Sequence, residues 1–211
     1  MQITKFTHSC LRIEGDGVLV VDPGGFSERS ALAGADAVLI THEHPDHLDV
    51  EAVTEAVRQR PGLTVFVHPD VLPKTEAFAA AVTTVEPGAE FLAAGFTVRA
   101  FGGQHAVIHP DVPRIANIGY LISDGTANLY HPGDSYHVPE GTTVETLFVP
   151  LHAPWAKVSE TIDFVRTVRP ERAFALHDGL LNDNGFGIYQ GLMDRLSGTT
   201  YARLAPGSTI G

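Results

Sequence analysis

The chain has 211 residues, of which 44% are hydrophobic and 18% are charged, as in ordinary soluble globular domains. Its 25 acidic and 14 basic residues give a formal charge of -11, which disfavours nucleic acid as a partner because phosphate binding depends on Lys and Arg. The single cysteine, Cys10, excludes a disulfide framework and a cysteine-based zinc cluster. We expect one domain over residues 1–211.

The N-terminal residues 1–6 alternate like a β-strand and lack the charged start and long apolar region of a signal peptide. No apolar segment approaches the roughly 20 residues that a membrane span requires. A lone cysteine fits a reducing compartment. We therefore expect a cytoplasmic protein without a membrane partner. The sequence carries no signal for an oligomeric state.

The first third of the chain is predicted to form a β-meander followed by alternating strands and helices. Gly15-Asp16-Gly17 is a strong hairpin signal, and Pro23-Gly24-Gly25 ends the third strand. Apolar residues near helical spacing predict helices over residues 47–59 and 71–81. The strands predicted in this part cover residues 3–6, 9–14, 18–22, 37–41 and 63–67.

The remaining two thirds repeat this mixture of strands and helices. Periodicity predicts an amphipathic helix over residues 159–168 and a closing helix over residues 188–196. Strands are expected at residues 83–86, 90–92, 97–101, 118–122, 128–130, 147–149 and 172–176. Strands interrupted by helices in both halves predict an α/β fold, namely a four-layer αββα sandwich of two mixed β-sheets with helices outside.

Residues 41–47, Thr-His-Glu-His-Pro-Asp-His, directly follow the apolar run of residues 37–40. The candidate metal ligands in this stretch are His42, His44, Asp46 and His47. Side chains alternate in an extended backbone, so the first three are expected on one side, with the last turning away as a helix begins. Imidazole and carboxylate ligands without thiolates suit a catalytic zinc or similar metal. A polar surface turn is the alternative, and the density of ligand types after an apolar strand disfavours it.

This motif resembles the His-x-His-x-Asp-His signature of the metallo-β-lactamase superfamily. The later motifs resemble that family in the right order: Gln104-His105 and Gly133-Asp134 each follow an apolar strand, and His177 ends the last core strand. The resemblance covers about residues 3–180 and implies the four-layer fold. It is nearest to the small ascorbate-6-phosphate lactonase-like branch of metal-dependent hydrolases.

The resemblance implies a binuclear site. One metal ion is assigned to His42, His44 and His105, the other to Asp46, His47 and His177, and Asp134 bridges the two. The same gathering is expected from the residues alone, because each candidate follows an apolar strand and thus reaches one edge of the sheets. Two divalent ions, zinc first and manganese or iron as alternatives, would share a hydroxide, lower its pKa and polarise the substrate oxygen.

Two residues are candidates for catalysis. Asp46 is predicted to orient the bridging hydroxide or accept its proton. His131, three residues before Asp134, is predicted to orient a ligand or to donate a proton to the substrate. Asp22 matches an Asp-Pro of the family and is predicted to orient a ligand histidine, with a simple turn role as the alternative.

Three further residues have open roles. His8 resembles a histidine of the lactonase-like branch and is either part of the cleft or a strand-surface residue. Arg114 either holds an anionic group of the substrate or is solvated. His152 lies in a loop on the inferred active-site side, where an exposed histidine is the simpler interpretation.

The leading hypothesis is a binuclear metallohydrolase that cleaves an ester, lactone or phosphodiester bond of a small molecule, anionic molecules included. His44 stands where the oxygen-reducing di-iron members of the family carry Glu, which favours hydrolysis over redox chemistry. One alternative is a nuclease or phosphodiesterase acting on nucleic acid, which requires a basic groove. The other is a non-catalytic metal-binding scaffold or sensor.

Overall fold

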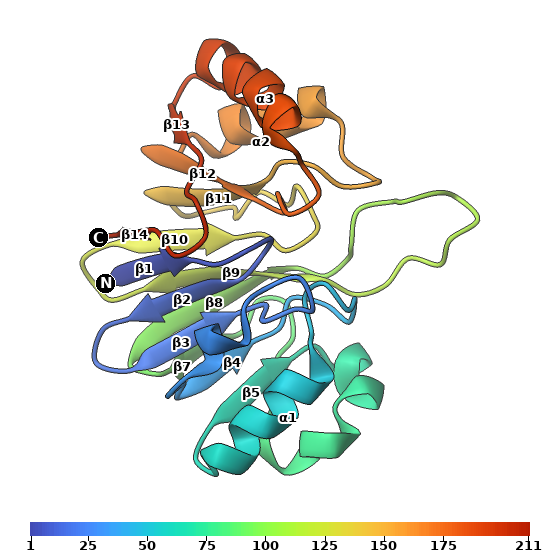
Figure 1. Cartoon of the computed structure of the whole chain (residues 1–211), viewed down its shortest axis with the longest axis vertical. Helices are drawn as coiled ribbons and strands as arrows, with labels where there is room; N and C mark the ends of the chain where they lie inside the picture. The colour runs from blue at the N-terminus through green and yellow to red at the C-terminus, as the bar shows by residue number, and fades with distance from the viewer.

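The N-terminal third of the chain supplies most of one seven-stranded sheet, with strand order β14-β1-β2-β3-β4-β5-β6. The computed structural model describes residues 1–211 (Figure 1). Pairing is antiparallel from β14 to β3 and parallel from β3 to β6. The strands are β1 (Gln2–Lys5), β2 (Leu11–Glu14), β3 (Val18–Val21), β4 (Ala37–Leu39), β5 (Thr64–Val67), β6 (Val82–Thr84) and β14 (Thr209–Ile210).

The rest of the chain forms a second seven-stranded sheet in the order β13-β12-β11-β10-β9-β8-β7. Pairing is parallel from β13 to β10 and antiparallel from β10 to β7. Its strands are β7 (Glu90–Ala93), β8 (Phe96–Gly102), β9 (Ile118–Ser123), β10 (Asn128–His131), β11 (Thr146–Pro150), β12 (Arg172–Leu176) and β13 (Thr200–Ala202). Both sheets are therefore mixed.

Helices cover the outer faces of the two sheets (Figure 1). The α-helices are α1 (Val50–Gln59), α2 (Val158–Val168) and α3 (Asp183–Leu196), and the short 3-10 helices are η1 (Arg29–Leu32), η2 (Pro69–Lys74) and η3 (Glu76–Ala81). Helix α1 lies near β5 at one end of the molecule, and α2 and α3 lie over β11 to β13 at the other. None of these helices combines the length and apolarity needed to cross a membrane.

Three clusters of buried apolar side chains fill the three spaces between these four layers. Strand β4 shows how the sequence builds them. Leu39 points into the cluster between the sheets, whereas Val38 belongs to the cluster under α1, because successive side chains of a strand face opposite ways. A strand buried on both faces is apolar throughout. The prediction of a four-layer αββα sandwich of two mixed sheets is confirmed.

Several predicted boundaries were wrong. Residues 71–81 form η2 and η3 instead of one α-helix, because Pro73 cannot donate a backbone hydrogen bond and Phe78 has non-helical angles. Helix α1 begins at Val50 and not at residue 47. Asp49 caps the helix, because its side chain accepts a hydrogen bond from the amide of Ala52. Helix α3 begins five residues earlier than predicted, at Asp183. The short strands β13 and β14 were not predicted.

The two sheets are hydrogen-bonded to each other where β4 ends. The amide of Ile118 donates to the carbonyl of Thr41 at 2.9 Å, and the hydroxyl of Tyr120 donates to the carbonyl of Ile40 at 2.9 Å. Tyr120 is fully buried. These bonds fix the start of residues 41–47 against β9, so the stretch with the candidate ligands is held by both sheets.

Tyr120→Phe is expected to lower the free energy of unfolding by ~1–3 kcal/mol, because the carbonyl of Ile40 loses its buried donor. Urea unfolding followed by circular dichroism measures this change. Tyr201→Phe is the matched control, since Tyr201 is also buried but its hydroxyl makes no hydrogen bond within the protein. Equal stability of the two variants would contradict a role for the Tyr120 bond.

Candidate metal centre

The candidate ligands all lie in loops that follow strands and meet at one edge of the two sheets. Residues 41–47 connect β4 to α1. His105 follows β8, Asp134 follows β10 and His177 follows β12. Loops at the ends of strands can take irregular conformations without breaking the sheets, so they carry functional groups while the strands keep them in place.

The structure brings every predicted ligand into one of two adjoining groups. The groups are His42, His44, His105 and Asp134, and His8, Asp46, His47 and His177, with the ligand atoms of each group within 4.8 Å of one another. Asp134 lies between them: its Oδ2 is 3.3 Å from His105 Nε2 and 3.2 Å from His177 Nε2, and its Oδ1 is 3.1 Å from His47 Nε2. Residues 45–47 form a turn, so Asp46 joins the second group while His42 and His44 belong to the first, and His44 and Asp46 line the same cavity.

Hydrogen bonds at Nδ1 fix the rings of three of these histidines. His47 Nδ1 lies 2.7 Å from Asp22 Oδ2, His105 Nδ1 lies 2.6 Å from the carbonyl of Ala106, and His177 Nδ1 lies 2.7 Å from the carbonyl of His152. Carbonyl and carboxylate oxygens only accept, so Nδ1 carries the proton in each ring. The lone pair of the neutral ring is then on Nε2, which faces the other ligands.

Buried atoms without a hydrogen-bond partner show that these side chains fit a metal ion. In the whole chain, such side-chain atoms are Ser9 Oγ, His47 Nε2, His105 Nε2 and Asp134 Oδ1. All but the serine point to the same place. His47 Nε2 and Asp134 Oδ1 lie 3.1 Å apart without a hydrogen bond between them, and divalent cations bound by the two groups would give all three atoms a partner. The all-N/O donor set also suits such an ion.

The carboxylate of Asp22 orients candidate ligand histidines. Of the two roles considered for Asp22, the structure therefore supports this one over a simple turn residue. Its carboxylate accepts from Thr41 N at 2.8 Å, from Thr41 Oγ1 at 2.7 Å and from His47 Nδ1. Because the Thr41 hydroxyl donates its proton to Asp22, Oγ1 can accept from His42 Nδ1 at 2.9 Å. One carboxylate thus orients two candidate ligands.

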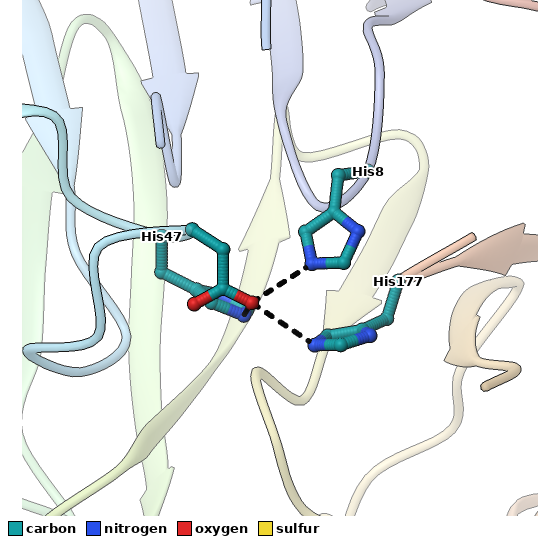
Figure 2. Close-up of side chains that lie close together, drawn as sticks. His8, His47 and His177 are labelled. Atoms are coloured by element: carbon teal, nitrogen blue, oxygen red, sulfur yellow. Dashed lines mark hydrogen bonds and ion pairs between the residues drawn. The ribbon is translucent and has the colours of Figure 1, made fainter. Parts of the chain in front are cut away.

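His8 is a buried member of the second group, and its ring contacts the carboxylate of Asp46. The amide of Gly179 donates to His8 Nδ1 at 3.2 Å, so the ring proton is on Nε2, which lies 3.1 Å from Asp46 Oδ2. Figure 2 shows His8, His47 and His177 converging, with dashed lines from His8 and His177 to the carboxylate. His8 is therefore placed to orient Asp46, although its ring is also near enough to join the ligands.

His131 lies below the site and not in the cleft. Its ring is fully buried; Nε2 donates to the carbonyl of Ser9 at 2.9 Å, and Nδ1 accepts from the amide of Gly133 at 3.2 Å. With both nitrogens occupied by backbone groups, the predicted proton transfer to a substrate has no free atom to use. This position favours the alternative that His131 orients a ligand, because the ring supports the turn that carries Asp134, and the catalytic role of His131 stays a prediction.

Arg114 and His152 do not line the cavity that the two groups share, although Arg114 lines a small adjoining pocket with His44 and His105. Arg114 Nε donates to the carbonyl of His105, and its Nη1 donates to Gln104 Oε1 at 2.8 Å. The guanidinium thus stabilises its own loop. The ring of His152 lies 3.0 Å from the hydroxyl of Tyr189, and its contribution to the site is the carbonyl that accepts from His177.

A cavity of about 440 Å³ opens onto both groups. The residues that line it are Gly25, Phe26, His44, Pro45, Asp46, His105, Ile108, Asp134, Pro154, Trp155, His177 and Leu180. Its volume lies within the range of small-molecule sites. The sequence did not indicate Trp155, whose Nε1 donates to Asp134 Oδ2 at 3.0 Å, or Asn117, whose Oδ1 accepts from Asp134 N at 2.9 Å. These contacts join distant loops, and only the uniqueness of the tryptophan hinted at a role.

Comparison with known proteins agrees with this geometry. The family model described as the β-lactamase superfamily domain matches residues 2–177. The chain belongs to the β-lactamase superfamily. The chain is 40% identical to a Mycobacterium tuberculosis protein over 215 aligned residues. The alignment covers 100% of this chain and 99% of the Mycobacterium protein.

Two further comparisons concern proteins described as hydrolases. A UPF0173 metal-dependent hydrolase of Carboxydothermus hydrogenoformans is 26% identical over 193 residues, 84% of each chain. The structure of Igni18, a metallo hydrolase from Ignicoccus hospitalis, has a TM-score of 0.77 at 18% identity and covers 99% of this chain and 97% of its own. The superfamily protein therefore has the metallo-β-lactamase fold. Its placement in the ascorbate-6-phosphate lactonase-like branch stays a prediction.

Charges inside the site balance one another. Burial lowers the pKa of His47, but the carboxylates of Asp134 and Asp22 outweigh burial and hold this pKa well above its ordinary value. The pKa of His177 is likewise lowered by burial but raised overall, to about 9, by Asp134 and Asp46. Burial raises the pKa of Asp134, and the two histidines outweigh it and keep this pKa well below its ordinary value. Both histidines are therefore protonated at pH 7 before an ion binds.

Zinc binding at pH 7 is expected to release about two protons, one each from His47 and His177, because imidazole binds metal only when neutral. Because the pKa of both rings is raised in the folded chain, that of His177 to about 9, zinc affinity falls as the pH is lowered through this value. Calorimetry in buffers of different ionisation enthalpy counts the protons. His177→Gln should release one proton fewer, and a heat independent of the buffer would contradict the expectation.

Gly24 contacts the backbone of the ligand loop so closely that no side chain fits. A Cβ at this position would lie 1.8 Å from the carbonyl oxygen of Asp46 and 2.5 Å from the amide of His47. Gly24→Ala must displace two candidate ligands, and is expected to weaken zinc binding ~10–100-fold. Competition with a chromophoric chelator measures the affinity. Gly62→Ala is the control, because a Cβ there meets nothing within 4 Å, and equal affinities of the two variants would refute the argument.

Proposed function

We propose that this superfamily protein is a hydrolase that depends on two divalent metal ions and cleaves an ester, lactone or phosphodiester bond of a small molecule. The observation that carries the proposal is the convergence of His47 Nε2, His105 Nε2 and Asp134 Oδ1, all buried and without a hydrogen bond, next to an open cavity that His105 and Asp134 line. A purely structural site is usually closed by its ligands, whereas a catalytic site stays accessible. The accessible cavity thus favours an enzyme over a scaffold or sensor.

The proposed ligands follow the two groups. His42, His44 and His105 would hold one ion and Asp46, His47 and His177 the other, while Asp134, which contacts histidines of both groups, would be shared between them. Zinc is the ion we propose first, with manganese or iron as alternatives, because the donors are nitrogen and oxygen only. When bound, such ions supply a water of lowered pKa and polarise an oxygen of the substrate.

Asp46 is the proposed catalytic carboxylate. It lines the cavity, and 22% of its side chain is exposed. Burial raises its pKa, but hydrogen bonds from His177 and His8 outweigh burial and lower it, so that the carboxylate is ionised at neutral pH. In that state it accepts a proton from the attacking water, while the Nε2–H of His8 keeps the carboxylate oriented.

The surroundings of the cavity support a small-molecule substrate. No Lys or Arg lines the cavity, and the formal charge of the chain is -11, so a nucleic acid would find few partners for its phosphates. We also propose a cytoplasmic location, because Cys10 is a free thiol that is buried within the fold.

Asp134→Ala is expected to lower kcat/KM by about 100-fold or more, because Asp134 contacts both groups and its loss removes several kcal/mol of stabilisation. His44→Ala affects only one group and should cost less. The exposed Asp163 on α2 gives the control Asp163→Ala, which should leave activity unchanged. Zinc content and rates on an ester, a lactone, a phosphodiester and a thioester are measured together.

The proposal fails if protein containing two equivalents of metal hydrolyses none of these compounds. It also fails if His44→Ala and Asp134→Ala retain the metal content and the rates of the unmodified protein.

A further inference from the structure

An apolar wall surrounds the candidate metal centre. Phe26, Ile108 and Leu180 line the cavity although 50%, 38% and 53% of these side chains are exposed. These three side chains come from the loops after β3, β8 and β12. Trp155, from the loop after β11, is the fourth member of the wall. Figure 1 shows the loop between β8 and β9, which carries Ile108, extending away from the sheets. Large exposed apolar side chains that gather around a cavity indicate a binding surface.

No positive side chain reaches this cavity. Arg114 is bonded to the carbonyl of His105 and to Gln104 and does not line the cavity. Lys5 is fully buried and donates to the carbonyl of His8 and to Asp178. The groups at the floor are imidazoles and the carboxylates of Asp46 and Asp134. The proposed metal ions would bind the oxygen at the reacting bond, but an anionic group elsewhere on the substrate would normally be recognised by Arg or Lys, and this cavity has neither.

Trp155 connects the apolar wall to the floor. Its ring is 9% exposed and lines the cavity, while its Nε1 donates to Asp134 Oδ2 at 3.0 Å. Its ring centroid lies 6.0 Å from that of His105 and 6.4 Å from that of His177. An apolar group held against Trp155 is therefore beside the proposed reaction centre. Because it is the only tryptophan of the chain, its fluorescence reports on the cavity alone.

We infer that the substrate is an uncharged carboxylic ester or lactone whose apolar acyl chain is held by Phe26, Ile108, Trp155 and Leu180. This inference rests on the proposed hydrolytic function and narrows the range of its substrates. A phosphodiester is disfavoured, because its negative charge would lie against an apolar wall without Lys or Arg. In the reaction, the oxygen of water bonds to the acyl carbon and the bond from that carbon to the alkoxy oxygen breaks. The alkoxy oxygen leaves with a proton from the water, and a carboxylic acid and an alcohol result.

The first test compares three compounds with the same reporter on the metal-loaded protein: p-nitrophenyl acetate, p-nitrophenyl hexanoate and bis(p-nitrophenyl) phosphate. The expected order of kcat/KM places the hexanoate first, about tenfold or more above the acetate, because each methylene gains contact with the wall. The phosphodiester is expected last. A phosphodiester rate above that of the hexanoate, or equal rates for the two esters, would overturn the inference.

The second test adds a charge to the wall. Leu180→Lys is expected to lower kcat/KM for the hexanoate about tenfold or more and to change that for the acetate much less. Leu72→Lys is the matched control, because Leu72 is 42% exposed but lies in η2, away from the cavity. Ile108→Lys repeats the test on another loop, and thermal unfolding checks that each variant is folded. Equal losses for both esters in Leu180→Lys and Ile108→Lys would count against the proposed wall.

A binding measurement separates this inference from the proposed function. The uncharged ketone 2-octanone has no leaving group, and octyl phosphate has a similar chain with a charged end. Titrated into the metal-loaded protein, the ketone is expected to change the fluorescence of Trp155 at lower concentration than the phosphate, and Leu180→Lys should weaken this binding. If the ketone binds and none of the ester, lactone, phosphodiester and thioester is hydrolysed, the proposed function fails, whereas the inference that the cavity binds an uncharged apolar ligand stands. If the phosphate binds more tightly than the ketone, the inference fails even when esters are hydrolysed.

Discussion

The carboxylate of Asp22 holds the ligand loop in place, and the rest of the site depends on this interaction. It accepts hydrogen bonds from the backbone and hydroxyl of Thr41 and from His47, at the point where β3 ends. Asp22 has a φ of 48°, in the left-handed region that an aspartate adopts only at a cost. His8 and His177 also have positive φ, at 65° and 52°. Three of the five non-glycine residues with positive φ thus lie at the site, the other two being Ala94 and Arg169.

Strain and unpartnered atoms at one place mean that the fold stabilises a site that is unfavourable by itself. The three buried apolar clusters supply the compensating stability, because they continue through all four layers on the other side of the ligand loops. Metal ions that bind the folded chain add to its stability by mass action. An ion bound at the centre would therefore offset the local strain and give a partner to atoms that lack a hydrogen bond.

Much of the fold was predictable because the signals are local. Strands such as β4 are short apolar runs bounded by turns, and the motif of residues 41–47 lies within one loop. His105, Asp134 and His177 could be placed because each follows such a strand. The helix at residues 71–81 was wrong because its periodicity outweighed Pro73 in the prediction.

The parts that sequence could not supply depend on contacts between distant loops. The bond from His131 to the carbonyl of Ser9 spans 122 residues, and the bond from His8 to Asp46 spans 38. The proton on His8 Nε2 follows only from the position of Gly179. Trp155, Asn117 and the direction of Arg114 likewise have no local signature, since each is set by packing and not by spacing along the chain.

The bonds that join β9 to the end of β4 have a consequence for how the protein matures. The first candidate ligands belong to the first sheet, whereas His105, Asp134 and His177 belong to loops of the second. During synthesis the N-terminal half emerges first and offers only part of each ligand group. The first group lacks Asp134 until the loop after β10 has formed, and the second group lacks His177 until the last core strand has formed and the two sheets have stacked. Loading of metal is thus a late event, and the docking of one sheet on the other is the step that permits it.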